Sequence, residues 1–135
     1  MDIRPARTVA DVEAAAGVLD GPPRPDATEE FLADPRHHLL LAWEGGAVVG
    51  MVSGVEMTHP DKGTEMFLYE LGVAEEARGR GIGRALTDAL RDLATERGCY
   101  AMWVMTEQDN VAALRTYEGA GATRLPDSAY LEWRL

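Results

Sequence analysis

The segment ARGRGIGRALTDAL, residues 77–90, constrains the fold of this chain more than any other. Glycine destabilises a helix interior by about 1 kcal/mol relative to alanine, and neighbouring like charges repel one another. The chain nevertheless places three glycines and three arginines at the start of a helical pattern, although its formal net charge is −10. We therefore expect a turn that leads into a helix and binds a polyanion. Its residues are Arg78, Gly79, Arg80, Gly81, Gly83 and Arg84.

The residues that follow this turn give the clearest helical pattern in the sequence. Apolar residues recur there with the 3-4 spacing that predicts one buried helix face, and Gly98 marks an end. The segment before the turn, TEMFLYELGV at 64–73, reads as a strand. The free N–H groups and partial positive charge of a helix N-terminus make this strand–turn–helix order suited to binding phosphate. The apolar positions are Ile82, Ala85, Leu86, Ala89, Leu90, Leu93 and Ala94.

The N-terminal part of the chain predicts two helices and a hairpin. Thr8 with Asp11 forms a capping-box pattern, and the proline-rich segment 20–26 ends the helix that follows it. A second short helix is expected after Thr28, and HLLLAW and VVGMVSGVEM then predict strands joined at Gly45 and Gly46.

The C-terminal part predicts a strand, a helix and a last strand. CYAMWVM reads as a strand buried on both faces, Asn110 caps a helix that Gly119 and Gly121 close, and SAYLEWRL forms the final strand. The element order predicts one α/β (α+β) domain over residues 1–135, with a mixed, mostly antiparallel sheet flanked by helices.

Composition and charge limit the partners. An excess of 23 acidic over 13 basic residues argues against nucleic acid and favours a cationic partner. No apolar run reaches the roughly 20 residues that cross a bilayer, so we expect no membrane association. The start of the chain lacks the apolar stretch of a secretory signal, and the single cysteine, Cys99, fits a reducing compartment. We therefore expect a cytoplasmic protein.

The spacing in the turn separates three kinds of phosphate site. A mononucleotide P-loop needs a Lys and a hydroxyl that are absent here, and Arg84 and Leu86 stand where a dinucleotide fingerprint would need further glycines. The pattern R/Q-x-x-G-x-G does fit, at Arg78, Gly81 and Gly83. Together with YELGVAEEARGRGIG and the later NVAALRTYEGAGA, it resembles the GCN5-related N-acetyltransferase (GNAT) superfamily.

The resemblance implies acetyl-CoA as the cofactor. It implies that backbone N–H groups of residues 78–84 bind the coenzyme A pyrophosphate, aided by arginine side chains. The pantetheine arm would lie along the strand near Leu71 and Val73, with room left by Gly72. The implied cofactor-binding residues are Leu71, Gly72, Val73, Arg78, Gly79, Arg80, Gly81, Ile82, Gly83, Arg84, Asn110 and Ala113.

Acetyl transfer to an amine also needs groups that move protons. By the resemblance, Tyr117 is the catalytic acid that protonates the leaving thiolate, and strand N–H groups near Val73 stabilise the oxyanion. Glu70 is the expected base, with Glu65 and Glu107 as alternatives. We expect no metal, because the adjacent His37 and His38 point to opposite faces of a strand.

The strand TEMFLYELGV is further similar to the corresponding strand of small aminoglycoside 3-N-acetyltransferases. This likeness implies a cationic small-molecule amine as substrate, bound by Glu65, Tyr69, Glu70, Glu107 and Asp109. A polyamine or peptide amine, or a non-catalytic acyl-CoA-binding module, stays an alternative. The exposed C-terminal strand could also pair two copies in a homodimer. The wider set of candidate acidic residues is Glu56, Asp61, Glu65, Glu70, Glu107, Asp109 and Asp127.

Overall fold

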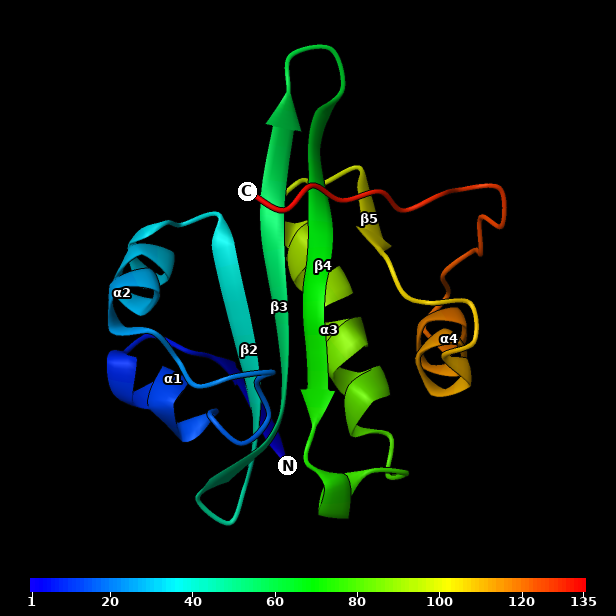
Figure 1. Ribbon diagram of the computed structural model, residues 1–135. Helices are drawn as coiled ribbons and strands as arrows, with labels where there is room; N and C mark the ends of the chain where they lie inside the picture. The colour runs from blue at the N-terminus through cyan, green and yellow to red at the C-terminus, as the bar shows by residue number, and fades with distance from the viewer.

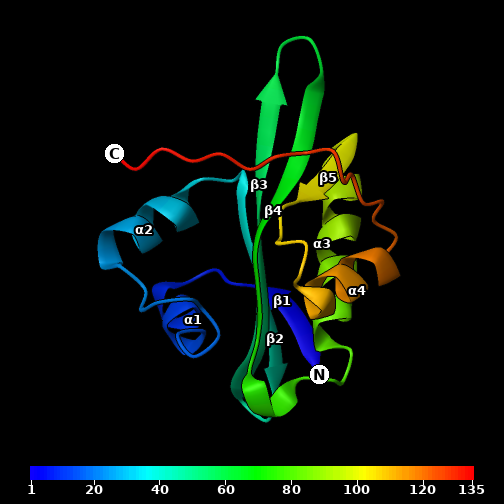
Figure 2. The same ribbon diagram turned by 45° about the vertical axis from the view of Figure 1, so that its right-hand side comes forward.

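The computed structural model describes residues 1–135 as a five-stranded sheet with two helices on each face (Figure 2). Neighbouring strands are antiparallel except β4 and β5, which run parallel, so the predicted mixed, mostly antiparallel sheet is confirmed. No helix has the length and apolar character needed to span a bilayer. The strands, in their order across the sheet, are β1 (Asp2–Pro5), β2 (His37–Glu44), β3 (Ala47–His59), β4 (Gly63–Val73) and β5 (Ala101–Val104).

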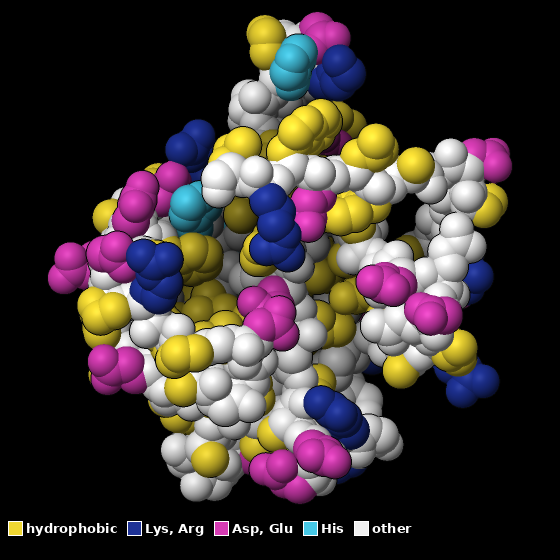
Figure 3. Space-filling view, in the orientation of Figure 1, with side chains coloured by type: hydrophobic (Ala, Val, Ile, Leu, Met, Phe, Trp, Pro, Cys, Tyr) yellow, Lys and Arg dark blue, Asp and Glu magenta, His cyan; other side chains and the backbone are white.

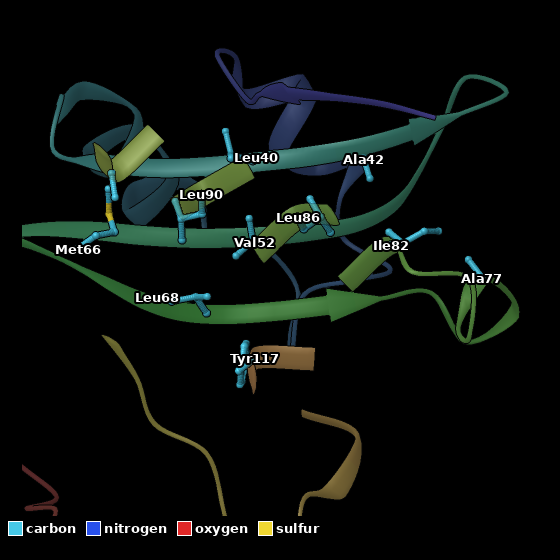
Figure 4. Packing of buried hydrophobic residues seen from close by; sticks show 11 residues of the cluster. Leu40, Ala42, Val52, Met66, Leu68, Ala77, Ile82, Leu86, Leu90 and Tyr117 are labelled. Atoms are coloured by element: carbon cyan, nitrogen blue, oxygen red, sulfur yellow. The ribbon is translucent and has the colours of Figure 1, made fainter. Parts of the chain in front are cut away.

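Helices α1 and α2 cover one face of the sheet, and α3 and α4 cover the other (Figures 1 and 2). Alternate residues of β2 serve the two faces: Leu39 and Leu41 pack with α1, whereas Leu40 and Ala42 pack with α3. The larger core lies on the α3 side, where Leu86 and Leu90 are fully buried (Figure 4). The helices are α1 (Val9–Ala14), α2 (Pro25–Ala33), the short 3-10 helix η1 (Glu75–Ala77), α3 (Ile82–Glu96) and α4 (Val111–Gly119).

Local signals in the sequence place most of these elements. The capping box is confirmed, because Thr8 Oγ1 accepts from the Asp11 N–H at 3.2 Å and Asp11 accepts from the Thr8 N–H at 3.1 Å. Helix α2 begins at Pro25, three residues before the expected Thr28, because proline is well suited to the first helical position.

The edge of β4 that faces β5 is open along its second half. Strand β5 pairs with β4 only from Glu65 to Leu68, after which the two strands separate. The pairing between β3 and β4 shifts register between Ser53 and Gly54, a bulge that leaves Tyr69 without a directly opposite residue. Residues of β4 beyond Leu68 therefore pair with β3 alone.

Two expectations about the sheet are wrong, and one strand was not expected. The last strand is absent, because residues 122–135 form no strand and instead cross over β4 and β3 (Figure 1). The segment therefore offers no formed strand for the expected homodimer pairing, and Trp133 within it is 82% exposed. Strand β5 is a half-exposed edge strand, not one buried on both faces. The sequence analysis also missed β1, which pairs with β2.

Candidate active site

The turn between β4 and α3 presents a row of free backbone donors. None of the six N–H groups from Gly79 to Arg84 donates a hydrogen bond within the protein, and the first helical bond is from Ala85 to Gly81 at 3.0 Å. Gly79 and Gly81 hold this shape with φ values of +74° and +83°, a region that favours glycine. A Cβ atom at either position would meet no atom within 4 Å, so the space beside both glycines is open. Free donors at a helix N-terminus form an anion-binding site.

The arginines of this turn are held by partners within the chain. Arg78 Nε donates to the Val73 carbonyl at 3.1 Å, which ties the turn back to the end of β4. Arg80 pairs with Glu44 of β2 at 2.6 Å, and Arg84 pairs with Asp88 of α3 at 3.0 Å. Arg80 and Arg84 are therefore ion-paired within the chain and Arg78 is bonded to a backbone carbonyl, whereas the backbone donors of the turn are unengaged.

Two residues near the end of β4 direct their backbone N–H and C=O groups away from β3, toward the open edge. The Ala74 N–H donates to the Val49 carbonyl at 2.9 Å, which fixes the alternation along the end of β4. Gly72 therefore faces β3, and the backbone groups of Leu71 and Val73 face the open edge.

Gly72 serves a different purpose from the one expected. A Cβ atom there would lie 2.2 Å from the carbonyl oxygen of Val18, which follows α1. Its missing side chain makes room for that backbone and not, as the resemblance implied, for the pantetheine arm.

Tyr117 reaches from α4 toward β4 on the α3 face of the sheet (Figure 4). Its side chain is buried, and its hydroxyl makes no hydrogen bond to another protein group. Burial raises the pKa of this phenol above its ordinary value, so it is protonated at neutral pH. Asn110 caps α4, as predicted, by accepting from the Ala113 N–H at 3.1 Å, and Ala113 packs against the same core.

Glu70 lies on the opposite face of β4 from Tyr117. Its Oε2 accepts the Asp20 N–H at 2.9 Å, and Ser53 is its partner across the sheet. Burial raises the pKa of the Glu70 carboxyl, and the nearby Asp20 carboxylate adds to the rise, whereas the Asp20 N–H opposes it. Glu70 is thus a carboxylate whose affinity for a proton is higher than usual.

Glu70 also lines a hollow of about 390 Å³ between the sheet and helices α1 and α2. In Figure 3 apolar surface lies recessed between the α1–α2 side of the molecule and the middle of the sheet. Most of its lining is apolar, and Glu70 is its single carboxylate. The lining residues are Val12, Leu19, Pro23, Ala27, Thr28, Phe31, His37, Leu39, Met51, Ser53, Val55, Tyr69 and Glu70.

The other expected substrate-binding residues are scattered. Tyr69 lines the hollow and is 69% exposed, whereas Glu65 accepts from the Tyr100 hydroxyl at 3.3 Å. Glu107 and Asp109 stand in the loop between β5 and α4 and do not line the hollow.

Glu56 was expected among the acidic residues that bind substrate, and this expectation is wrong. Glu56 is buried and engaged by His38 at 2.6 Å and by Arg97 at 2.9 Å, on the α3 face. His37 instead lines the hollow, so the two histidines do point to opposite faces as predicted.

Sequence reasoning missed two residues of the site. Ser53 joins Glu70 only through the register of β3 and β4, and the Asp20 N–H reaches Glu70 across 50 residues of chain. The pattern of the sequence carries no signal for either contact.

The model of the acetyltransferase (GNAT) family matches residues 8–122. The chain belongs to this family. The N-alpha-acetyltransferase RimI of Mycobacterium tuberculosis is 35% identical over 120 residues, which cover 89% of this chain and 73% of that protein. A mycothiol acetyltransferase of Geodermatophilus obscurus is 37% identical over 99 residues, and the match covers 70% of this chain but only 31% of that protein.

Solved structures share the fold over the whole chain. An aminoglycoside acetyltransferase from an uncultured soil metagenomic sample superposes with a TM-score of 0.85 at 23% identity, covering 99% of this chain and 97% of that one. The aminoglycoside acetyltransferase AAC(6′)-Iy, bound to a bisubstrate analogue that contains coenzyme A, has a TM-score of 0.84 at 21% identity, with 99% and 98% covered. At this identity the likeness establishes the fold.

Acetyl-CoA is the acetyl donor consistent with this family, and the residues present fit it. A diphosphate needs several donors in a tight space, which the six free N–H groups of the turn provide. The open space beside Gly79 and Gly81 allows the close approach of such a group to the backbone. The chain is therefore a GNAT acetyltransferase whose fold presents a turn of free backbone donors beside an open strand edge.

Proposed function

We propose that this protein transfers an acetyl group from acetyl-CoA to a primary amine, with Glu70 as base and Tyr117 as acid. The observation that carries the proposal is the placement of these two side chains on opposite faces of β4, beside its open edge. A group held along that edge is accessible from the Glu70 side and from the Tyr117 side.

The turn and the open edge bind and orient the donor. When bound, acetyl-CoA supplies an activated thioester. The N–H groups of Gly79 to Arg84 hold its diphosphate, and the backbone groups of Leu71 and the N–H of Val73 pair with its extended arm as a neighbouring strand would. The sequence resemblance adds Asn110 and Ala113 to this set, although the Ala113 N–H already donates to Asn110.

Glu70 removes the proton that keeps the acceptor amine cationic. A lysine-like amine has a pKa of about 10.4 and is almost fully protonated at neutral pH, so it cannot attack until it loses a proton. The raised pKa of Glu70 makes its carboxylate a stronger base than an ordinary glutamate. Its negative charge also attracts the ammonium form into the hollow before the proton moves.

Tyr117 donates the proton that the departing sulfur needs. An ordinary thiol has a pKa of about 8.5, below that of a phenol at about 10, so the transfer is uphill and requires a hydroxyl positioned to donate to the sulfur as the C–S bond breaks. Burial keeps Tyr117 protonated, and its hydroxyl is not committed to any protein partner. Its proton is therefore available for the reaction.

An aminoglycoside is one candidate acceptor, with acetylation at the 3-N position as the sequence resemblance implies. The net charge of −10 favours a polycation. The structural neighbours that are named for a position are 6′-acetyltransferases, so they lend no support to the 3-N position. The RimI relative is named for N-alpha acetylation, which makes a peptide amine the second candidate.

Release of free thiol from acetyl-CoA tests this proposal with a panel that contains kanamycin, spermidine, short peptides and simple primary amines. Mass spectrometry of the product locates the acetyl group. We expect turnover with at least one primary amine, with roughly 100-fold losses in Glu70→Gln and Tyr117→Phe. Wild-type turnover in both variants would remove these residues from the proposal.

A further inference from the structure

We infer that the acceptor is a monoamine whose amino group is attached to an apolar group, and that this apolar group binds in the hollow beside α1 and α2. The inference rests on the proposed function, because it names the substrate class of the same site. Glu70 connects the proposed reaction with the hollow, because it is both the proposed base and one of the residues that line the hollow.

The walls of the hollow are apolar on both sides. The segment that contains α1 and α2 contributes Val12, Leu19 and Phe31, and the sheet contributes Leu39 and Val55. No Lys or Arg lines the hollow. An aliphatic or aromatic group that enters it leaves water and contacts carbon on both sides, which favours binding in proportion to the apolar area removed from water.

The hollow also has polar lining groups, among them Thr28, His37 and Ser53. Ser53 stands directly across the sheet from Glu70, and Thr28 is buried in α2. Neither the Ser53 hydroxyl nor the Thr28 hydroxyl makes a hydrogen bond to another protein group. The Ser53 hydroxyl and the Glu70 carboxylate can bind one ammonium group, whose remaining substituent then points toward the apolar walls.

The same geometry disfavours a polycation in the hollow. Glu70 is the single carboxylate among the lining residues, so each further ammonium group inside the hollow would lie against its apolar walls, which is unfavourable. The other acidic side chains named from the sequence are elsewhere: Glu56 is paired on the far face, and Glu107 stands in the β5–α4 loop. A volume of about 390 Å³ is also near the small end of ligand pockets, about 300–1,000 Å³.

The first experiment compares acceptors by kcat/KM at fixed acetyl-CoA. The acceptors are 2-phenylethylamine, isoamylamine, ethanolamine, spermidine, kanamycin, and two peptides that begin with Leu or Ser but are otherwise identical. We expect kcat/KM for 2-phenylethylamine and isoamylamine to exceed that for ethanolamine by roughly 10- to 100-fold. We expect the same difference in kcat/KM between the Leu peptide and the Ser peptide. Preference among the free amines identifies a small molecule as the source of the apolar group, and preference among the peptides identifies a chain terminus.

The second experiment changes the wall. Phe31→Ala removes a ring that lines the hollow, and Leu32→Ala is the matched control, because Leu32 packs against the same core but does not line the hollow. We expect Phe31→Ala to lower the ratio of kcat/KM for 2-phenylethylamine over ethanolamine about tenfold, whereas Leu32→Ala leaves the ratio unchanged. An equal change in both variants would overturn the inference, and thermal melts verify that both are folded.

The third experiment separates binding from turnover. The tertiary amine N,N-dimethyl-2-phenylethylamine binds as an ammonium ion, but its free base has no N–H to exchange for an acetyl group and it is not acetylated, so calorimetry with this probe reports the hollow alone. We expect the wild-type protein to bind this probe, and we expect its Kd to rise about tenfold in Phe31→Ala. If the wild-type protein does not bind the probe, the inference is overturned. If spermidine or kanamycin gives the highest kcat/KM of all the acceptors, the inference is overturned but the proposed function stands. Binding of the probe without turnover of any amine supports the inference about the hollow and refutes the proposed function.

Discussion

Replacing Gly81 with glutamate tests the coenzyme-binding turn most severely, because this position combines three properties of the site. Gly81 is the N-cap of α3, its φ is +83°, and a Cβ there would point into open space. A side chain at this φ strains the backbone by about 1 kcal/mol. For a chain of this length, that strain lowers the melting temperature by roughly 3–6 °C, so the variant still folds.

The larger effect of Gly81→Glu is on coenzyme affinity. Two like unit charges about 6 Å apart interact by roughly 3 kcal/mol at an effective dielectric constant of about 20, and salt reduces this figure. A loss of about 2–3 kcal/mol raises the Kd for coenzyme A by roughly 30- to 140-fold. Gly81→Gln carries the same backbone strain and similar bulk without the charge, so the difference between the two variants isolates electrostatic repulsion.

Titration calorimetry with coenzyme A at two salt concentrations measures this effect. Gly98→Glu is the matched control, because Gly98 has a φ of +80° and open space but follows the far end of α3. We expect all three variants to lose similar stability, and only Gly81→Glu to show the large, salt-sensitive rise in Kd. Wild-type affinity in folded Gly81→Glu would refute the assignment of the diphosphate to this turn.

Three further predictions concern catalysis and stability. Tyr117→Phe should lower kcat roughly 100-fold and leave the Kd for coenzyme A unchanged; an unaltered kcat in steady-state assays would exclude Tyr117 as the acid. Glu70→Gln should remove the acidic limb of the pH–rate profile, which in the wild type rises through the raised pKa of Glu70. Because a raised folded-state pKa favours folding at low pH and opposes it once the carboxyl ionises, Glu70→Gln should melt no lower than wild type at pH 8; a lower melting temperature there would argue against that shift. Gly72→Ala should destabilise by about 3 kcal/mol because its Cβ would lie 2.2 Å from the Val18 carbonyl, whereas Gly83→Ala, whose contacts are 3.6 Å or longer, should stabilise α3 by roughly 0.5–1 kcal/mol in chemical denaturation. Equal effects of the two alanine substitutions would contradict the packing described at Gly72.

Local signals explain what the sequence predicts well. The apolar spacing in residues 82–96, the Thr8 capping box and the glycine pair between β2 and β3 each act over a few residues, and all three are found in the structure. The shape of the glycine-rich turn before α3 belongs with them, because its glycines are needed for a local backbone conformation.

Features that depend on distant partners could not be predicted in the same way. Strand β1 is four residues long, ends in proline and has no alternating pattern, so only its pairing with β2 defines it. SAYLEWRL has the composition of a strand, yet strand propensity does not supply a partner, and the segment forms no ladder.

The candidate site shows the same division. Tyr117 and Glu70 were named from their motifs, but the hollow beside Glu70 arises where α1, α2 and the sheet meet. The internal partners of the arginines, such as Glu44 for Arg80, lie tens of residues away in sequence. Glu70 is the single carboxylate that lines the hollow, and a count of carboxylates in the sequence does not show this.

Thiol release from acetyl-CoA, followed across the amine panel with mass analysis of the products, tests the central claim most directly. The account predicts acetylation of the nitrogen of a primary amine, with activity that depends on both Glu70 and Tyr117. Tight binding of coenzyme A without acetylation of any amine would contradict it and would identify the chain as an acyl-CoA-binding module.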